Sequence, residues 1–387
     1  MFSKTIYFFP SIHPEKINVN PLQGFFSSKM SNLPMSQKPE HRTTIQDIAR
    51  AAKVSPATVS LALNQKGSIG EKTRAKVLRI AMEMNFIPNS IARALRGGRT
   101  YSLGVVVNHL KSSFFTKVFN GIERVTDALG FTVLISQTHD DIDKERAQVR
   151  HLAERGVDGL ILFPCSQEWS HVEEVLQRFR LPTGLIGNYF ENKEYLAVVA
   201  DNWRGACEAV QHLASLRQKP VIHVAGPSIQ SMCLIRRRAF ESIMSRNFPD
   251  RSPADWIFPV RALTSAEGYR VMTEVLGRHR PPVSLFVVND DTALGVVRYC
   301  TDHRLRIPED VALVGFSDIE TLYDLDIPLS TIRIPAEAMG EKTATMLIEN
   351  IRNGNLPLPE RVELPVELVV RGSSMLPEKS RARVPAR

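Results

Sequence analysis

The sequence feature that most constrains the fold is a pair of short amphipathic segments joined by a tight turn, between Thr44 and Leu63. A threonine that can cap a helix precedes apolar residues at i, i+3, i+4 and i+7, which are Ile45, Ile48, Ala49 and Ala52. After the turn at Lys53–Val54, Ser55 can cap a second helix and Pro56 suits its first position. Two short helices joined in this way predict a helix-turn-helix.

A third helix is expected over Glu71–Asn85, and three helices of this size can close a small core. Its inward face is predicted to consist of Ala75, Leu78, Ala81 and Met82. The basic residues off that face are Lys72, Arg74, Lys76 and Arg79. On these residues alone, an ordinary three-helix bundle with a solvated basic rim remains an alternative.

The next segment favours a more specific interpretation. Residues 87–99 combine Pro88, a capping Asn89, about one and a half turns of helix-forming residues and a stop at Gly97–Gly98. Isolated helices shorter than roughly 12 to 15 residues are marginal in water. We therefore expect this segment to be ordered by a surface on which it docks.

Residues 44–96 resemble the headpiece and hinge helix of the LacI/GalR family of bacterial transcriptional regulators. The matching residues are Thr44–Ala49, Val54–Ser55, Thr58–Ser60, Asn64, Pro88–Asn89 and Ala92–Arg96. The resemblance implies that the second helix lies in the major groove of DNA. It also implies that the paired hinge helices of a homodimer enter the minor groove, where Leu95 would be a wedge between base steps.

The DNA-binding residues implied by the resemblance are Thr44, Ser55, Pro56, Ala57, Thr58, Ser60, Leu61, Asn64, Asn89, Ala92, Arg93, Leu95 and Arg96. Base readers would be Pro56, Ala57 and Leu61. The family commonly has an arginine at the position of Leu61, and an arginine can bond a guanine edge. A different operator sequence is therefore expected. Lys53 occupies a turn position where the family often has glycine, so a left-handed conformation there would cost roughly 1 kcal/mol.

The distribution of charge agrees with DNA as the partner. Residues 1–100 contain 15 Lys and Arg and 5 Asp and Glu, a net charge of +10. The remaining 34 basic and 36 acidic residues give −2. The basic excess therefore lies entirely in the part predicted to meet phosphate.

From Tyr101 onward the pattern changes to short apolar runs alternating with helical stretches. The expected strands are Leu103–Val107, Phe131–Ile135, Gly159–Phe163, Gly184–Gly187, Pro220–Gly226, Ser284–Val288 and Val311–Phe316. Continuous apolar runs are typical of strands buried on both faces of a parallel sheet. The predicted fold class is α/β, with two doubly wound halves behind the helical headpiece, and such sheets bind ligands outside the carboxyl ends of their strands.

This region resembles the effector domain of the same family, which has the fold of periplasmic sugar-binding proteins. The matching motifs are Phe114–Phe115, Asp201–Asn202 with Gly205–Ala206, Val288–Asp290 with Ala293–Gly295, Val314–Asp318, Leu329–Ile332 and a closing strand near Arg361–Val370. The family implies an effector in the cleft between the halves, with crossings of the chain near Asp201, Phe316 and Asn355.

The predicted organisation follows from these boundaries. It comprises a disordered arm (1–42), the headpiece (43–88), the hinge helix and linker (89–100), the effector domain (101–372) and a disordered tail (373–387). The first half would contain 101–200 and 317–355, and the second half 201–316 and 356–372. Initiation at Met30 or Met35 would shorten the arm. An arm that contacts DNA through Lys29, Lys38 and Arg42 is the less favoured alternative.

Four residues are predicted to bind the effector. Asp290 can accept hydrogen bonds from a ligand, although it could instead cap the helix that follows. Phe114 and Phe115 would flank the ligand or belong to the core. In the alignment implied by the family, Leu234 replaces a sugar-binding arginine and Arg236 keeps a more structural position. Loss of that donor argues against a sugar or a sugar phosphate.

Other chemistry finds little support. The sequence has no G-x-G-x-x-G, G-x-x-x-x-G-K-[ST], H-E-x-x-H or G-x-S-x-G motif, so we predict no enzyme, catalytic residue or cofactor. The scattered cysteines Cys165, Cys207, Cys233 and Cys300 have no metal-binding spacing, which predicts reduced thiols and no metal. A periplasmic solute-binding protein would lack the helix-turn-helix and would need a signal peptide, and the first residues are not a convincing one.

The sequence therefore predicts a cytoplasmic, homodimeric transcriptional repressor with no membrane segment. Its partners would be a double-stranded DNA operator and a small-molecule effector. The effector would change the relative orientation of the two halves and so the spacing of the paired hinge segments.

Overall fold

The computed structural model describes residues 43–63, 69–84, 86, 99–190, 195–217, 220–354 and 360–375. The chain divides into two compact units between Thr100 and Tyr101, and each is described by itself. The predicted arm and hinge helix, and most of the predicted tail, lie outside the described residues.

The headpiece consists of α1 (Ile45–Ala52), α2 (Pro56–Leu63) and α3 (Glu71–Glu83). A capping box begins α1, because the Asp47 amide donates to the Thr44 hydroxyl at 3.3 Å and the Thr44 amide donates to the Asp47 carboxylate at 2.9 Å. Ser55 caps α2 by accepting from the Thr58 amide at 3.1 Å. Lys53 has φ 57°, so this turn position, where the family often has glycine, is left-handed.

The predicted inward face of α3 is partly wrong. Ala81 is buried as predicted and Leu78 is half-buried, but Ala75 is exposed and Met82 is 76% exposed. Contact with α1 and α2 fixes a rotation that buries the β-branched Val77 and Ile80 in their place. Periodicity alone could not separate the two faces, since both carry apolar residues at helical spacing.

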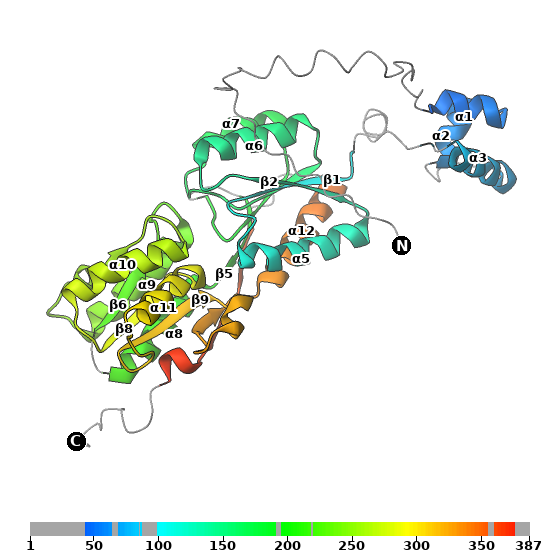
Figure 1. Ribbon diagram of the computed structural model, residues 1–387. Helices are drawn as coiled ribbons and strands as arrows, with labels where there is room; N and C mark the ends of the chain where they lie inside the picture. The colour runs from blue at the N-terminus through cyan, green and yellow to red at the C-terminus, as the bar shows by residue number, and fades with distance from the viewer. Residues whose placement is uncertain are drawn as a thin grey trace, which may run out of the picture. The chain divides into compact units, whose positions relative to one another are not determined.

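The first lobe of the second unit contains a fully parallel sheet of order β11-β5-β4-β3-β1-β2. Its strands are β1 (Ser102–Val107), β2 (Thr132–Gln137), β3 (Gly159–Leu162), β4 (Thr183–Ile186), β5 (Leu196–Ala200) and β11 (Arg361–Leu364). Its helices are α5 (Ser113–Leu129), α6 (Ile142–Glu154), α7 (Ser170–Phe179) and α12 (Ala336–Asn353). Figure 1 shows α6 and α7 on one face of the sheet and α5 and α12 on the other.

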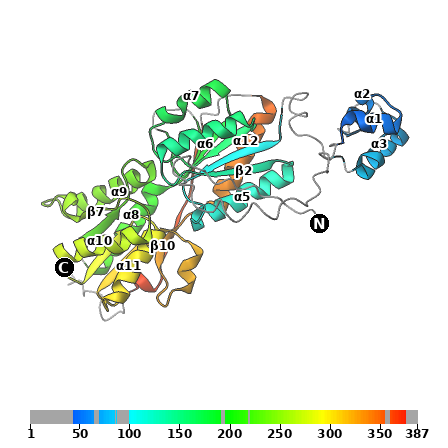
Figure 2. The same ribbon diagram turned by 45° about the horizontal axis from the view of Figure 1, so that its top comes forward.

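The second lobe contains a sheet of order β12-β10-β9-β8-β6-β7, in which only the β10–β12 pair is antiparallel. Its strands are β6 (Val221–Ala225), β7 (Ile257–Pro259), β8 (Val283–Val287), β9 (Val311–Ser317), β10 (Ser330–Arg333) and β12 (Glu367–Val369). Its helices are α8 (Asn202–Arg217), α9 (Ser231–Asn247), α10 (Ser265–Arg278) and α11 (Asp290–Asp302). Three 3-10 turns complete it, η1 (Pro253–Trp256), η2 (Glu320–Asp324) and η3 (Gly372–Ser374). Figure 2 shows both lobes from a second side.

The chain crosses between the lobes three times, and two of the crossings differ from the prediction. The first lies at Asp201, as expected. The second lies at Ile334–Pro335 instead of near Phe316, because β10 pairs with β9 and stays in the second sheet. The third lies at Pro365–Val366 instead of near Asn355. The prediction of one closing strand near Arg361–Val370 is wrong, because this stretch forms two strands, β11 and β12, in different sheets. The predicted boundaries of the halves at 317–355 and 356–372 are therefore wrong.

Close packing of two helices holds the first lobe together. A Cβ added at Gly121 of α5 would lie 2.1 Å from the Glu337 carbonyl oxygen of α12. One added at Gly340 of α12 would lie 2.0 Å from the Val118 carbonyl oxygen of α5. The two helices therefore touch backbone to backbone, which only glycine allows.

The described residues contain no helix that is both long and apolar enough to cross a membrane. All four cysteines are free, and Cys165, Cys233 and Cys300 are buried, as expected for small apolar residues.

Candidate functional site

The exposed side of α2 carries the side chains predicted to read bases. Ser55, Pro56 and Ala57 are exposed, and Leu61 is 42% exposed. The opposite side of the helix, at Val59 and Ala62, is fully buried. The remaining predicted contacts on this helix, Thr58 and Ser60, are half-buried, and Thr44 is exposed beside the start of α1.

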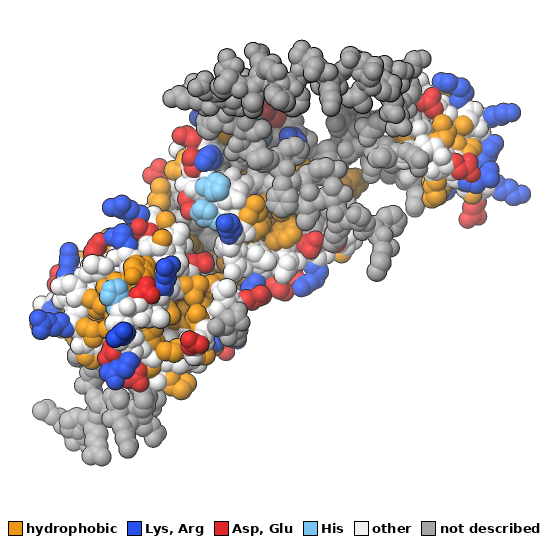
Figure 3. All heavy atoms as spheres, viewed as in Figure 1, with side chains coloured by type: hydrophobic (Ala, Val, Ile, Leu, Met, Phe, Trp, Pro, Cys, Tyr) orange, Lys and Arg blue, Asp and Glu red, His pale blue; other side chains and the backbone are white. Residues whose placement is uncertain are grey.

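The headpiece is also basic. Its described residues include six Lys and Arg and three Asp and Glu. Figure 3 shows Lys and Arg side chains on the surface of the headpiece. A positive surface around an exposed second helix is the arrangement that contacts phosphates while the helix contacts bases.

The other predicted DNA contacts lie outside the described residues. They are Asn64, Asn89, Ala92, Arg93, Leu95 and Arg96. Their roles stay predictions.

Between the two lobes of the second unit lies a cleft of about 360 Å³. Its lining follows the carboxyl ends of strands in both sheets, where doubly wound folds bind ligands. Phe114, Phe115 and Phe163 form an aromatic wall on the first lobe. The Phe163 ring meets the Phe114 and Phe115 rings edge-on, with centroids 6.4 Å and 5.8 Å away. Phe114 and Phe115 thus lie where the prediction put them, and Phe115 also belongs to the core.

Polar groups of the first lobe lie beside this aromatic wall. Asp140 accepts from the Asn108 amide at 2.5 Å and contacts the His109 Nε2 atom at 2.8 Å. Asn188 also lines the cleft, and its side-chain amide donates to the Pro164 carbonyl. The first lobe therefore offers an apolar surface bordered by fixed polar groups, which is the usual composition of a small-molecule site.

On the second lobe the cleft is lined by Arg236 and not by Leu234, which differs from the prediction. The guanidinium donates to the Asn202 side-chain oxygen at 2.9 Å and 2.8 Å and to the Val288 carbonyl at 2.6 Å. It also lies 3.6 Å from the centre of the Phe316 ring. Burial lowers the pKa of Arg236 to about 10, so the side chain stays protonated at neutral pH. A cation therefore lies at the cleft wall.

The three adjacent arginines of α9 point in different directions. Arg236 is 2% exposed and lines the cleft. Arg237 pairs with Glu241 on the surface at 2.8 Å, and Arg238 is exposed. The interpretation of this run as a solvated face therefore holds for two of the three residues. The helix phase that turns Arg236 inward could have been read from buried Cys233 and Phe240, which share its side of α9.

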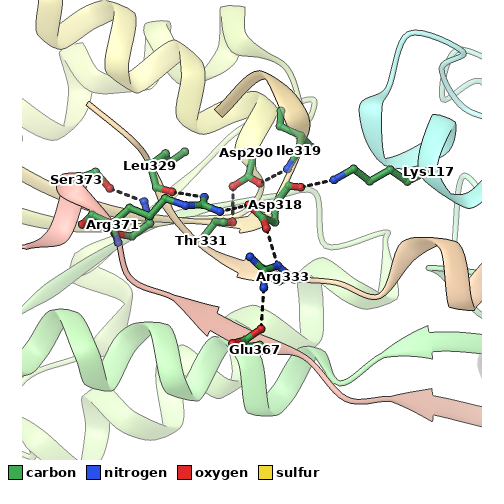
Figure 4. Close-up of polar contacts among 11 residues, drawn as sticks. Lys117, Asp290, Asp318, Ile319, Leu329, Thr331, Arg333, Glu367, Arg371 and Ser373 are labelled. Carbon is green, nitrogen blue, oxygen red and sulfur yellow. Dashed lines mark hydrogen bonds and ion pairs between the residues drawn. The ribbon is translucent and has the colours of Figure 1, made fainter. Parts of the chain in front are cut away.

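Asp290 does not line the cleft, which also differs from the prediction. Its side chain is fully buried, where it accepts from the Thr331 hydroxyl at 2.7 Å and the Ile319 amide at 3.2 Å (Figure 4). Burial raises the pKa of Asp290 to about 7. Asp290 is not the helix cap either, because Asn289 caps α11 by accepting from the Thr292 amide at 3.1 Å.

The carboxylate that does line the cleft from this helix is Asp291. Burial raises the pKa of Asp291, and the charge of His109 on the first lobe opposes that rise. The Asp291 carboxylate makes no hydrogen bond or ion pair with any described residue, so it is available to a ligand. The carboxylate that lines the cleft is thus one residue later than the predicted Asp290, because successive side chains of a helix point about 100° apart.

Comparisons with known proteins agree with both parts of the chain. Residues 44–89 match the model of bacterial regulatory proteins of the lacI family, and residues 210–374 match the periplasmic binding protein-like domain. The HTH-type transcriptional repressor PurR of Haemophilus influenzae (strain PittEE) is 26% identical over 332 residues, which cover 85% of this chain and 98% of the relative. The ribose operon repressor of Escherichia coli (strain K12) is 27% identical over 335 residues, covering 86% and 99%.

The fold agrees with a solved structure as well. The lac repressor dimer bound to operator and the anti-inducer ONPF superposes with a TM-score of 0.76 at 24% identity, covering 86% of this chain and 99% of that one. These three relatives are named as repressors and none as an enzyme, in agreement with the prediction of a regulator. A helix-turn-helix headpiece joined to a two-lobed ligand-binding unit therefore makes this chain a DNA-binding transcriptional regulator of the lacI family.

Proposed function

We propose that the chain is a homodimeric repressor whose operator affinity depends on a small molecule bound between the two lobes. The observation that carries this proposal is the cleft of about 360 Å³ at the strand ends of both sheets, in a chain that also has a DNA-binding headpiece. A ligand that contacts both lobes changes their relative orientation. That orientation sets the spacing of the two hinge segments of a dimer, and so links the effector to DNA affinity.

We infer an uncharged effector with hydrogen-bond donors and an apolar face. The unpartnered Asp291 accepts from a hydroxyl or an amine, and Arg236 donates to an oxygen. Phe114 and Phe163 supply flat contact area. The carboxylates of Asp140 and Asp291 and the cations of Lys111 and Arg236 offset one another in the cleft lining, which favours a ligand without net charge over a phosphorylated one. Neutral sugars remain candidates, because Leu234 does not line the cleft and Arg236 provides a donor there.

The test is a calorimetric and thermal-shift screen of the full chain against a metabolite panel. The panel contains neutral sugars, nucleosides, amines and sugar phosphates. Ribose is included because a relative is named for the ribose operon. We expect a neutral compound to bind and Asp291→Asn to weaken its binding by roughly tenfold or more, the effect of losing a hydrogen bond to a charged group.

Asp302→Asn is the matched control, because Asp302 lies on the same helix, outside the cleft lining. It should leave affinity unchanged. Preferred binding of a sugar phosphate, or equal affinity in the wild type and Asp291→Asn, would contradict the proposed effector class. With the ligand in hand, a gel shift on DNA recovered from a genomic pull-down decides whether it releases or strengthens operator binding.

A further inference from the structure

A short segment between β9 and η2 has an unusual backbone. Ser317 has φ 133° and Asp318 has φ 57°, and neither residue is a glycine. Side chains with a Cβ rarely adopt positive φ, so two successive residues in this state persist only where their surroundings hold them. Ser317 also lines the cleft. The strain is therefore stored at the ligand side of the second lobe.

Three side chains fix this segment to the second lobe (Figure 4). The buried Asp318 carboxylate accepts from Arg333 Nε at 2.8 Å and from Arg371 Nη2 at 2.7 Å. Burial raises the pKa of Asp318, but the bonds from the two arginines lower it more, so the carboxylate stays ionised. The Ile319 amide donates to the Asp290 carboxylate at 3.2 Å. Asp290, which the sequence suggested as a ligand, thus positions the backbone beside the cleft.

The two arginines lie next to the crossings between the lobes. Arg333 ends β10 immediately before the chain enters the first lobe, and it also pairs with Glu367 of β12 at 3.0 Å. Arg371 follows β12, soon after the chain has returned. The carboxylate of Asp318 therefore ties together two of the three connections about which the lobes can move.

The first lobe reaches this segment through Lys117 of α5. Its ammonium donates to the Asp318 carbonyl oxygen at 2.8 Å, and Figure 4 shows it extending from the opposite lobe. Lys117 makes no ion pair with a carboxylate among the described residues, so this bond is its specific interaction. Lys117 lies on α5, and Phe114 and Phe115 in the first turn of this helix line the cleft. Both ends of the contact are thus adjacent to the ligand cavity.

We propose that residues 317–319 form a switch segment and that Lys117 is the positioning residue through which this segment holds the two lobes together. The inference rests on the proposed function, in which the cleft binds the effector. A ligand that displaces Ser317 also moves the Asp318 carbonyl, which breaks or strengthens the Lys117 bond. Because the surrounding contacts hold this strained backbone in place, a change in those contacts allows the segment to relax to a second conformation.

Other contacts between the lobes lie at the start of α9. The Asn188 side-chain oxygen accepts from the Ser231 hydroxyl at 3.2 Å and the Met232 amide at 3.3 Å. The backbone amide of Gln167 donates to the backbone carbonyl of Ile229 at 2.9 Å. These contacts remain when Lys117 is changed. Loss of the Lys117 bond is therefore expected to shift the lobe arrangement without separating the lobes.

The test measures the distance between the lobes by pulsed electron paramagnetic resonance on the full chain without ligand. Nitroxide labels are attached to cysteines introduced at the exposed positions Glu154 of α6 and Thr273 of α10, after Cys207→Ser removes the half-buried thiol. Lys117→Met removes the charged donor and Lys117→Arg keeps it. We expect a second distance population in Lys117→Met that is enriched roughly tenfold or more, and a return to the wild-type distribution in Lys117→Arg.

The matched control is Arg124→Met on the same helix. Arg124 pairs with Glu337 and Glu341 of α12, which belong to the same lobe, so its loss should not change the distance between lobes. Asp318→Asn removes the carboxylate that binds Arg333 and Arg371, so it loosens the attachment of the segment to the second lobe. This variant should give the same second population as Lys117→Met.

A single wild-type distance in Lys117→Met would overturn the proposal. So would an equal shift in Arg124→Met. The measurement uses no effector, so its failure is separate from a failure of the cleft to bind the metabolite panel.

Discussion

Replacing Asp290 with asparagine should change how stability depends on pH. Burial raises the pKa of this carboxyl from 3.8 to about 7, so between these values the folded protein keeps a proton that the unfolded chain releases. The contribution of Asp290 to the free energy of unfolding therefore falls as pH rises from 3.8 to about 7 and stays low above that range. About three pH units at roughly 1.4 kcal/mol each give about 4 kcal/mol.

His223 acts in the opposite direction, so the comparison must be a difference between two proteins. Burial lowers the pKa of His223 from 6.5 to about 4, and the unfolded chain binds the proton more tightly in that interval. Its contribution to stability rises with pH there. Subtracting the Asp290→Asn profile from the wild-type profile cancels His223, because that residue is unchanged in both proteins.

Urea unfolding followed by tryptophan fluorescence measures this difference. Trp169, Trp203 and Trp256 all lie in the second unit, so the signal reports the effector domain. We expect the wild type to lose up to about 4 kcal/mol relative to Asp290→Asn between pH 4 and pH 8. The variant also gives up one acceptor for Thr331 or Ile319, which costs about 1–3 kcal/mol at every pH and does not alter the slope. Parallel profiles would refute the assignment of Asp290 as a buried positioning group.

Three further outcomes are expected. Leu95→Lys should weaken specific operator binding strongly while the effector domain stays folded, and unchanged affinity in a gel shift would contradict a wedge in the minor groove. Light scattering at micromolar concentration should give a dimer, the assembly in which two hinge segments can pair on one operator, and a stable monomer would argue against this. Gly121→Ala should destabilise the first lobe by about 1–3 kcal/mol in thermal unfolding, because the added methyl group meets the α12 backbone, whereas Gly277→Ala, with open space around it, should not.

Local signals in the sequence determined the headpiece almost completely. The caps at Thr44 and Ser55 each depend on residues within a few positions, so the local pattern predicts them. The inward face of α3 was missed because it depends on contacts with α1 and α2, and two different rotations of that helix bury apolar residues.

In the effector domain the sequence determined the fold class and the position of the cleft, since buried parallel strands and their carboxyl ends follow from apolar runs. It did not determine which sheet receives β10 and β11, because strand pairing is a long-range choice that local composition does not encode. The positions of Asp290, Asp291 and Arg236 likewise depend on the rotation of α11 and α9 against the sheet. A shift of one residue on a helix turns a side chain by about 100°, which separates a buried carboxylate from one that lines the cleft. Only tertiary packing fixes that angle.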